Sequence, residues 1–219
     1  MRLLFCFPSI LECSTVTGKT LTLGDFSEIK GNVWIARTGV GIPATFCYAQ
    51  KVIEILRPSV VVLLGIAGIY PKVADKYPIG SVIGIKEERW GDLGLELEEH
   101  PFFKSIYECE WDSDFYHESF KCATTYQDLG LNTLIPLLNS LTVQSCTGNI
   151  KTADVRQNFG EIENMEGAAL LQLTHRCGIP FYEIRSISNI AGNRKMEHKN
   201  ILKALDELKI VFEKMIEKC

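Results

Sequence analysis

Two short polar segments in the last third of the chain have the residue types of a small-molecule site. Met165-Glu166 opens an apolar run that predicts a buried helix, and Arg185, Ser188 and Asn189 lie at and beyond the end of a run that predicts a buried strand. Polar groups where a strand ends are typical of ligand pockets in open α/β sheets. Each residue alone has an ordinary explanation, since glutamate favours the first turn of a helix and asparagine favours a turn. Together they favour a binding site.

The other candidates for chemistry are carboxylates. Glu12 follows the apolar N-terminal run, and Asp92 lies in an acidic stretch further along. The chain has no Gly-x-Ser-x-Gly motif and no cysteine with an evident base, so nucleophilic acyl transfer is not indicated. Separated carboxylates without a nucleophile suit hydrolysis through an oxocarbenium-like transition state, where one activates water and another stabilises the developing charge. The candidate catalytic groups at this point are the carboxylates Glu12, Glu166 and Asp92 and the amide of Asn189.

Glycine-rich turns lie where strands should approach a ligand. Residues 38–44, Thr-Gly-Val-Gly-Ile-Pro-Ala, follow a strand and open a helix, but they lack the third glycine of a dinucleotide site and the lysine of a P-loop. Residues 65–68, Gly-Ile-Ala-Gly, follow the most apolar strand. Small residues there would clear space for a substrate, so Ile66 and Gly68 are predicted to border it.

The composition argues against several classes of protein. With 219 residues, a net charge of −4 and 46% hydrophobic residues, the chain has the balance of a soluble globular protein without a nucleic-acid surface. No apolar run has the length of a membrane span, and the N-terminal run, broken by Pro8, lacks the cleavage site of a signal peptide. The 4 histidines and 8 cysteines show no metal-ligand spacing. We therefore expect a cytoplasmic protein with reduced thiols, no metal, and neither nucleic acid nor membrane as a partner.

Alternating apolar segments predict an α/β fold. Residues 60–64 are apolar at every position, as in a central parallel strand covered on both faces. The predicted strands are 2–7, 33–37, 59–64, 81–85, 120–123, 141–147 and 181–186, and the predicted helices are 44–56, 165–177 and 199–218. Strands alternating with helices predict a single three-layer α/β domain over residues 1–219, with a twisted mixed sheet flanked by helices.

Residues 86–118 interrupt this alternation with an acidic, aromatic-containing stretch of little periodicity. A loop this long inside an α/β domain is usually a functional lid or an interface segment. A solvated insertion is the alternative.

These motifs together resemble the nucleoside phosphorylase/nucleosidase superfamily and, within it, the futalosine hydrolases most closely. The resemblance runs almost end to end and is most specific in Met-Glu-Gly-Ala-Ala at 165–169 and Arg-Ser-Ile-Ser-Asn at 185–189. It also covers Glu12, both glycine turns, residues 88–94 and Thr147-Gly148. It implies a nucleoside phosphorylase-like fold, a purine nucleoside substrate, no cofactor, and a homodimer or larger homo-oligomer in which residues 86–118 take part.

The resemblance also implies roles for individual residues. Glu166 would bind the ribose hydroxyls, Met165 would pack against the sugar, and Glu12 would position and deprotonate the attacking water, with Arg185 as its companion. A carboxylate that grips the 2′-hydroxyl binds it more strongly as positive charge develops on the ring. An aromatic residue stacks on the purine in relatives, and Phe159 is the candidate here.

Asn189 departs from the aspartate that adenine-directed nucleosidases carry at this position. An amide offers donors and an acceptor but no titratable proton. Its NH₂ can donate to O6 of a 6-oxopurine while its carbonyl accepts the N7 proton, whereas an adenine amino group would face it donor to donor, at about 1–3 kcal/mol. This favours hypoxanthine over adenine by roughly ten- to a hundredfold. The predicted reaction is hydrolysis of futalosine to hypoxanthine and dehypoxanthine futalosine, in menaquinone biosynthesis.

Two further features bear on the alternatives. Ile66 stands where adenine nucleosidases commonly have a hydroxyl residue, and residues 14–30 lack the arginines with which phosphorylases bind phosphate. Both favour futalosine hydrolysis. The alternatives that remain are a methylthioadenosine/adenosylhomocysteine or aminodeoxyfutalosine nucleosidase, a purine nucleoside phosphorylase, and a non-catalytic nucleoside-binding protein. The group recognised on the 5′ side of the ribose has no signature in the sequence.

Overall fold

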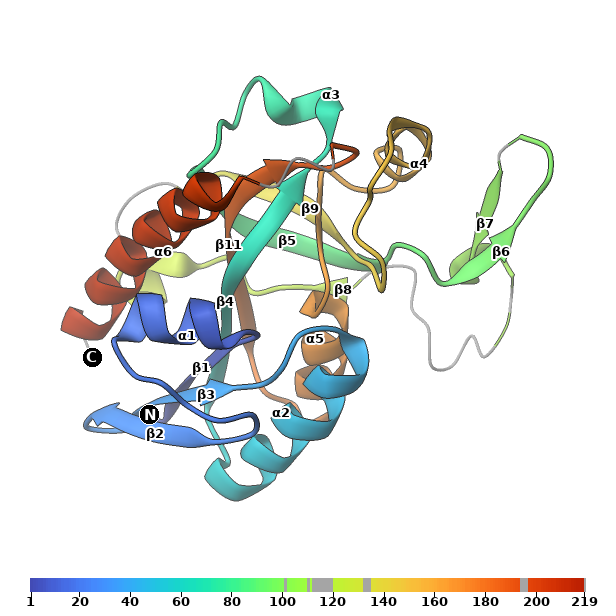
Figure 1. Ribbon diagram of the computed structural model, residues 1–219. Coiled ribbons are helices and arrows are strands. Elements are labelled where there is room, and N and C mark those ends of the chain that lie inside the picture. The colour runs from blue at the N-terminus through green and yellow to red at the C-terminus, as the bar shows by residue number, and fades with distance from the viewer. Residues whose placement is uncertain (101, 110, 112–119, 132–134, 194–196, 219) are drawn as a thin grey trace.

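The computed structural model describes residues 1–219 except 101, 110, 112–119, 132–134, 194–196 and 219 (Figure 1). Its framework, within the described residues, is a nine-stranded mixed sheet in the order β10-β9-β5-β11-β4-β1-β3-β2, with β8 paired to β5. The strands are β1 (Leu3–Phe7), β2 (Phe26–Lys30), β3 (Val33–Arg37), β4 (Val60–Ile69), β5 (Val82–Trp90), β8 (Phe120–Lys121), β9 (Leu137–Thr142), β10 (Ile162–Asn164) and β11 (Phe181–Ile190).

The central strand is β4, as its apolar sequence predicted. It pairs in parallel with β1 on one side and β11 on the other, and it is buried along almost its whole length. The far end of β4 also pairs antiparallel with β10, through Ile69 with Ile162 and Gly68 with Glu163. The strands β4, β11, β5, β9 and β10 therefore form a closed ring, which gathers residues from distant parts of the sequence.

Helices cover both faces of the sheet, which confirms the predicted three-layer arrangement (Figure 1). One layer contains α1 (Ile10–Thr17) and α6 (His198–Lys218), and the other contains α2 (Ile42–Leu56) and α5 (Gly167–Arg176). Alternate residues of β4 face the two layers: Val62 packs in the core with α1 and α6, and Val61 in the core with α2 and α5. Side chains of successive strand residues point to opposite faces, so an apolar strand fills both cores.

The strands that carry the site extend further than the sequence predicted. β4 continues through residues 65–68 to Ile69, and β11 continues through Asn189 to Ile190 with a bulge between Ile187 and Asn189. The small and polar residues were expected to follow the strands, and this expectation was wrong. The parallel pairing of β4 with β11 keeps both backbones extended, and the bulge re-aims the side chains at its end.

Several short elements had no signal in the sequence. They are α1, β2, β10, α4 (Ile150–Arg156), α3 (Pro71–Ala74) and the 3₁₀ turns η1 (Ile106–Glu108) and η2 (Tyr126–Leu129). The strand predicted at 141–147 is also shifted, because β9 ends at Thr142. Each of these elements is too short or too polar to show a hydrophobic period.

The segment 86–118 has more regular structure than its sequence predicted. β5 continues to Trp90, and β6 (Gly94–Glu96) pairs with β7 (Phe103–Ser105) in a two-stranded hairpin that projects from the body (Figure 1). Residues 110 and 112–119 lie outside the described residues. The part of the chain that the structure describes contains no helix long and apolar enough to cross a membrane.

Candidate active site

Glu166 is the buried N-cap residue of α5, at the head of the helix as predicted. Its side chain does not cap the helix, because Asn164 Oδ1 accepts the N–H groups of Glu166 (2.8 Å) and Gly167 (2.7 Å) instead. The Glu166 carboxylate is left for other partners: Oε1 accepts the Gly41 N–H at 3.0 Å, and Oε2 lies 3.3 Å from Arg185 Nη1. Burial raises the pKa of Glu166, and the Arg185 charge opposes that rise.

The glycine turn at 38–44 donates a backbone hydrogen bond to the Glu166 carboxylate. Gly41 begins α2 with φ 84°, in the left-handed region that glycine adopts without steric conflict. The turn therefore directs a backbone N–H at Glu166, in the manner in which related turns direct N–H groups at phosphate. The backbone of this turn was predicted to lie close to a ligand. In the structure it lies close to the Glu166 side chain.

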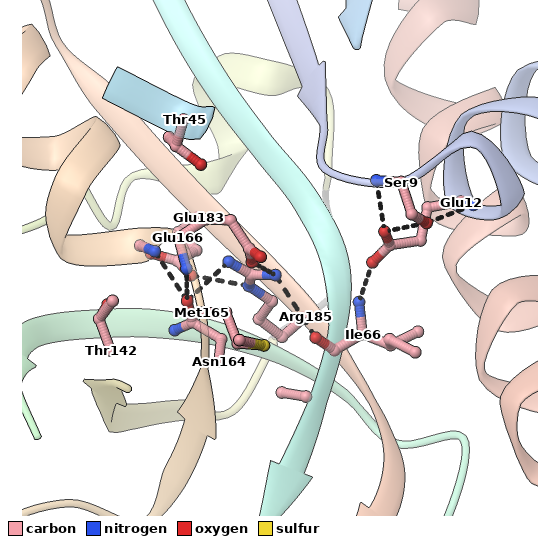
Figure 2. Close-up of polar contacts among 12 residues, drawn as sticks. Ser9, Glu12, Thr45, Ile66, Thr142, Asn164, Met165, Glu166, Glu183 and Arg185 are labelled. Carbon is pink, nitrogen blue, oxygen red and sulfur yellow. Dashed lines mark hydrogen bonds and ion pairs between the residues drawn. The ribbon is translucent and has the colours of Figure 1, made fainter. Parts of the chain in front are cut away.

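Arg185 lies at the centre of the buried polar group (Figure 2). Nε donates to Glu183 Oε1 at 2.7 Å, Nη2 donates to Asn164 Oδ1 at 3.0 Å, and Nη1 lies between Glu166 and the Ile66 carbonyl. Burial opposes its charge, but the neighbouring carboxylates Glu183 and Glu166 raise the pKa of Arg185 further above its ordinary value. Arg185 is thus a permanent cation that orients two carboxylates.

Glu12 lies in the first turn of α1, where a capping box fixes its carboxylate. Oε2 accepts from the Ser9 N–H at 2.9 Å and the Ser9 hydroxyl at 2.5 Å, while the Glu12 N–H donates to Ser9 Oγ. Oε1 accepts the Ile66 N–H of β4 at 3.0 Å (Figure 2). The side chain is only 5% exposed, so its position is set by protein donors rather than by bulk water.

Gly65 lies between the side chains of Glu12 and Arg185. A Cβ at Gly65 would lie 2.4 Å from Arg185 Nη1 and 2.9 Å from Glu12 Oε1, so both side chains converge on this strand backbone. The neighbouring Ile66 contacts both groups, through its N–H and its carbonyl respectively. The small residue was predicted to clear space for a substrate; in the structure it accommodates the two functional side chains.

Asn189 lies at the far end of β4, against Gly68. A Cβ at Gly68 would lie 3.1 Å from Asn189 Nδ2, and the half-buried amide is oriented by Ser188, whose hydroxyl donates to Asn189 Oδ1 at 2.9 Å. That hydroxyl also lies 3.2 Å from the Ala67 carbonyl. Among the described residues no acceptor meets Asn189 Nδ2 within hydrogen-bond distance, so the NH₂ group is available to a ligand.

A polar cluster beside Asn189 was missed in the sequence. Glu163, which pairs across the sheet with Gly68, accepts from the Thr147 N–H at 2.8 Å, the Thr147 hydroxyl at 2.5 Å and the Tyr70 hydroxyl at 2.8 Å. Burial, followed by the Glu163 charge, raises the pKa of Tyr70. The pairing of β10 with β4 brings Glu163 beside Gly68 and Asn189, and pairing between distant strands leaves no local pattern in the sequence. Met165, which follows this strand, has its sulfur 3.6 Å from that of Cys146.

The residues that surround Arg185 were missed as well. Glu183, Asn164 and Glu88 are buried and contribute to its hydrogen-bond network, directly or through one another. One signal was present: Glu183 stands two residues before Arg185 in an apolar strand and therefore shares its face. A pair of opposite charges on one face of a buried strand indicates a polar network.

Two residues that the sequence suggested as candidates, Phe159 and Asp92, lie outside the polar group around Arg185. Phe159 packs against a separate apolar cluster of Tyr70, Leu141, Val143, Ala153 and Ala191. It also lines a cavity of about 210 Å³ whose lining includes Arg89 and Trp90 but none of the predicted catalytic residues. Asp92 accepts the N–H groups of Gln144 and Ser145 and forms an ion pair with Arg156 at 3.2 Å, so it anchors the loop after β9. Stacking of Phe159 on a purine stays a prediction.

Comparison with known proteins decides the family. Residues 11–219 match the model of the phosphorylase superfamily. The chain belongs to this superfamily. It is 27% identical over 210 residues to futalosine hydrolase of Thermus thermophilus, covering 92% of this chain and 89% of the relative. It is 25% identical over 188 residues to 5′-methylthioadenosine/S-adenosylhomocysteine nucleosidase of Shewanella halifaxensis, covering 82% of this chain and 77% of the relative. These homologues are nucleosidases, which are hydrolases of N-glycosyl bonds.

Solved structures share the fold of this phosphorylase-superfamily member over its whole length. A futalosine hydrolase mutant of Helicobacter pylori superposes with a TM-score of 0.79 at 12% identity, covering 100% of both chains. The Streptococcus pneumoniae methylthioadenosine/S-adenosylhomocysteine nucleosidase in complex with 8-aminoadenine gives a TM-score of 0.79 at 16% identity, also covering 100% of both. The predicted nucleoside phosphorylase-like fold is confirmed.

Proposed function

We propose that this chain is a nucleosidase that hydrolyses the N-glycosyl bond of futalosine, releasing hypoxanthine and dehypoxanthine futalosine, as a step of menaquinone biosynthesis. The observation that carries the proposal is the side-chain amide of Asn189, whose Oδ1 accepts the Ser188 hydroxyl at 2.9 Å while its NH₂ group meets no acceptor among the described residues. Homology to futalosine hydrolase of Thermus thermophilus supports the same substrate.

Asn189 would recognise the base. Because the Ser188 hydroxyl donates to Oδ1, the NH₂ group can donate to the O6 of hypoxanthine. A carbonyl oxygen has two lone pairs, so Oδ1 can still accept the N7 proton that the leaving base acquires. Adenine would present its amino group to the NH₂ donor, and the unmatched pair would disfavour it.

Glu166 would hold the ribose. Its carboxylate is buried between the Gly41 N–H and Arg185, which limits its motion. A fixed carboxylate near the 2′-hydroxyl strengthens its hydrogen bond as the ring becomes cationic, so it stabilises the transition state more than the ground state. Met165 precedes it in the chain and would pack against the sugar.

Glu12 would position and deprotonate the attacking water. The donors from Ser9 and Ile66 hold its carboxylate at the end of the first strand, and Arg185 approaches the same strand backbone. General-base catalysis needs a carboxylate held within hydrogen-bond reach of water, and it requires no cofactor. A protein that only bound nucleosides would not need this group.

A second candidate, an adenine-directed nucleosidase, is favoured by the homology to methylthioadenosine/S-adenosylhomocysteine nucleosidases. A product assay in phosphate-free buffer separates the candidates, with futalosine, inosine and methylthioadenosine offered separately and the free base followed by chromatography. We expect hypoxanthine from futalosine. Adenine from methylthioadenosine, without turnover of futalosine, would replace the proposal with the adenine nucleosidase. Turnover only after addition of phosphate would identify a phosphorylase.

A further inference from the structure

A second pair of carboxylates, Glu88 of β5 and Glu183 of β11, lies behind Glu166. Both side chains are fully buried. A Cβ at Gly167 would lie 2.4 Å from Glu88 Oε1 and 2.6 Å from Glu183 Oε2, so these two oxygens converge on the backbone at the start of α5. Two ionised carboxylates in such a position would repel each other in a medium of low dielectric.

The hydrogen-bond partners of the pair leave one oxygen without a donor. Glu88 accepts at both oxygens, from Asn164 Nδ2 at 2.6 Å and from the Thr142 hydroxyl at 2.7 Å. Glu183 Oε1 accepts from Arg185 Nε at 2.7 Å, but the buried Oε2 has no partner in the described part of the chain. A proton on Glu183 Oε2 would complete the set, because it could be donated to Glu88 Oε1.

The charges around the pair also require a proton. Within the described residues, Arg185 is the cation in each ion pair of Glu166 and Glu183, and Glu88 makes no ion pair. From the other side the pair faces Cys122, which follows β8, and Tyr126 of η2. Burial raises the pKa of both the Cys122 thiol and the Tyr126 hydroxyl, so neither adds charge near neutral pH.

We propose that Glu88 and Glu183 share one proton and act as a positioning pair for Arg185 and Asn164, which in turn orient Glu166. Arg185 Nη1 lies beside the Glu166 carboxylate, and Asn164 Oδ1 accepts the Glu166 N–H. The pair thus fixes both the side chain and the backbone of Glu166 without contact with substrate. That Glu166 binds ribose rests on the proposed function; the shared proton does not.

The pair makes the stability of the protein fall as pH rises above the ordinary carboxyl pKa of 4.5. Burial and then repulsion from Glu183 raise the pKa of Glu88, and burial raises that of Glu183. A folded-state pKa above the unfolded value gives stability that is fully present below the ordinary value of 4.5 and is lost as pH rises through the folded-state value. Loss of the proton places two charges together, so Arg185 and Asn164 shift and Glu166 is displaced.

Two isosteric variants distinguish a shared proton from a merely structural role. Glu183→Gln places an amide N–H where the proton should be, leaves a carbonyl oxygen for Arg185 Nε, and keeps the total charge of the pair. Glu88→Gln keeps the same volume and charge, but neither amide orientation suits all the neighbours. With its NH₂ group at the Oε1 position it opposes the Asn164 amide donor, and with its NH₂ group at the Oε2 position it opposes the Thr142 hydroxyl donor and turns a carbonyl oxygen toward Glu183. The first variant therefore matches the network and the second does not.

The experiment compares wild type, Glu183→Gln and Glu88→Gln by infrared spectroscopy, by thermal unfolding against pH and by kcat/KM against pH. We expect a protonated-carboxyl band in wild type that both variants lack. Glu183→Gln should keep kcat/KM within a few fold at neutral pH and lose less stability and activity than wild type as pH rises. Glu88→Gln should lose about tenfold or more in kcat/KM.

An infrared band that is absent in wild type, or unchanged in Glu183→Gln, would overturn the shared proton. Equal losses of stability in wild type and Glu183→Gln as pH rises above 4.5 would also overturn it. The infrared and unfolding measurements need no substrate. They therefore decide the proposal even when no tested nucleoside is hydrolysed, and that second outcome would count against the proposed function alone.

Discussion

At the scale of single residues, we propose that the choice between amide and carboxylate at position 189 sets the preference between purine bases. Ser188 and Asn189 stand next to each other, and the hydroxyl donates to the amide oxygen at 2.9 Å. Replacing the amide with a carboxylate removes the donor that suits a 6-oxopurine and provides an acceptor for the amino group of adenine.

We predict that Asn189→Asp raises the kcat/KM ratio of methylthioadenosine to futalosine by about ten- to a hundredfold. The measurement is the pair of kcat/KM values on the two nucleosides. Ser188→Ala is the control for orientation: without the hydroxyl the amide can rotate, so the preference for hypoxanthine should weaken while Asn189 remains. An unchanged ratio in Asn189→Asp would disprove the assignment of Asn189 as the base-recognising residue.

Substitution of Glu12 tests the proposed activation of water rather than the substrate specificity. We predict that Glu12→Ala binds futalosine but loses about a hundredfold to ten-thousandfold in kcat, because general-base catalysis contributes a factor of that order. Binding is measured by calorimetry and turnover by release of base. Ser9→Ala is the comparison, since it removes one hydroxyl donor to the Glu12 carboxylate and leaves the carboxylate in place; its loss should be smaller. Full turnover by Glu12→Ala would show that another group activates water.

At the scale of elements, the candidate site depends on the backbone of β4, which carries no side chain at Gly65, where Arg185 and Glu12 converge. Gly65 in β4 has no room for a Cβ, since the nearest atom, Arg185 Nη1, would lie 2.4 Å away. A methyl group there would displace Arg185 or Glu12, and neither can move without losing buried hydrogen bonds.

We predict that Gly65→Ala lowers the free energy of unfolding by about 1–3 kcal/mol, as overpacking does, and reduces kcat/KM. Denaturant unfolding and the nucleosidase assay check both parts. Gly178→Ala serves as the control: Gly178 has φ +66° with no atom within 4 Å of an added Cβ, so strain should lower stability while kcat/KM stays unchanged. Wild-type kcat/KM in Gly65→Ala would contradict the described convergence of Glu12 and Arg185.

Comparison of the predicted with the observed strands and helices shows how much of the fold the sequence could predict. The long apolar runs gave β1, β3, the first half of β4 and the start of β11, because buried strands and amphipathic helices have a visible hydrophobic period. The head of α5 was placed correctly, and Glu166 with it. The sequence could not show that Glu163 would meet Gly68 or that Glu88 would meet Glu183. Those contacts depend on β10 and β5 closing the ring with β4 and β11, and pairing between distant strands leaves no local pattern.

At the scale of the whole molecule, the β6–β7 hairpin of segment 86–118 departs from the three-layer arrangement of the other described elements. The β6–β7 hairpin extends away from the sheet (Figure 1). Leu95 of β6 (40%) and Phe102, which precedes β7 (49%), are exposed. We propose that these two exposed apolar side chains contribute to an interaction surface. The expected homo-oligomer would cover it.

We predict that the wild-type protein sediments as a dimer or larger homo-oligomer, and that the double variant Leu95→Asp/Phe102→Asp sediments as a monomer, because charges buried in an interface without partners oppose association. Analytical ultracentrifugation measures both. Ile55→Asp, on the exposed side of α2, matches the change in charge and hydrophobicity at a single site away from the hairpin and should leave the assembly intact. If the double variant keeps the wild-type sedimentation coefficient but loses kcat/KM, the hairpin acts as a lid over the site and the interface lies elsewhere. If the wild-type protein is itself monomeric, the expected oligomer is wrong.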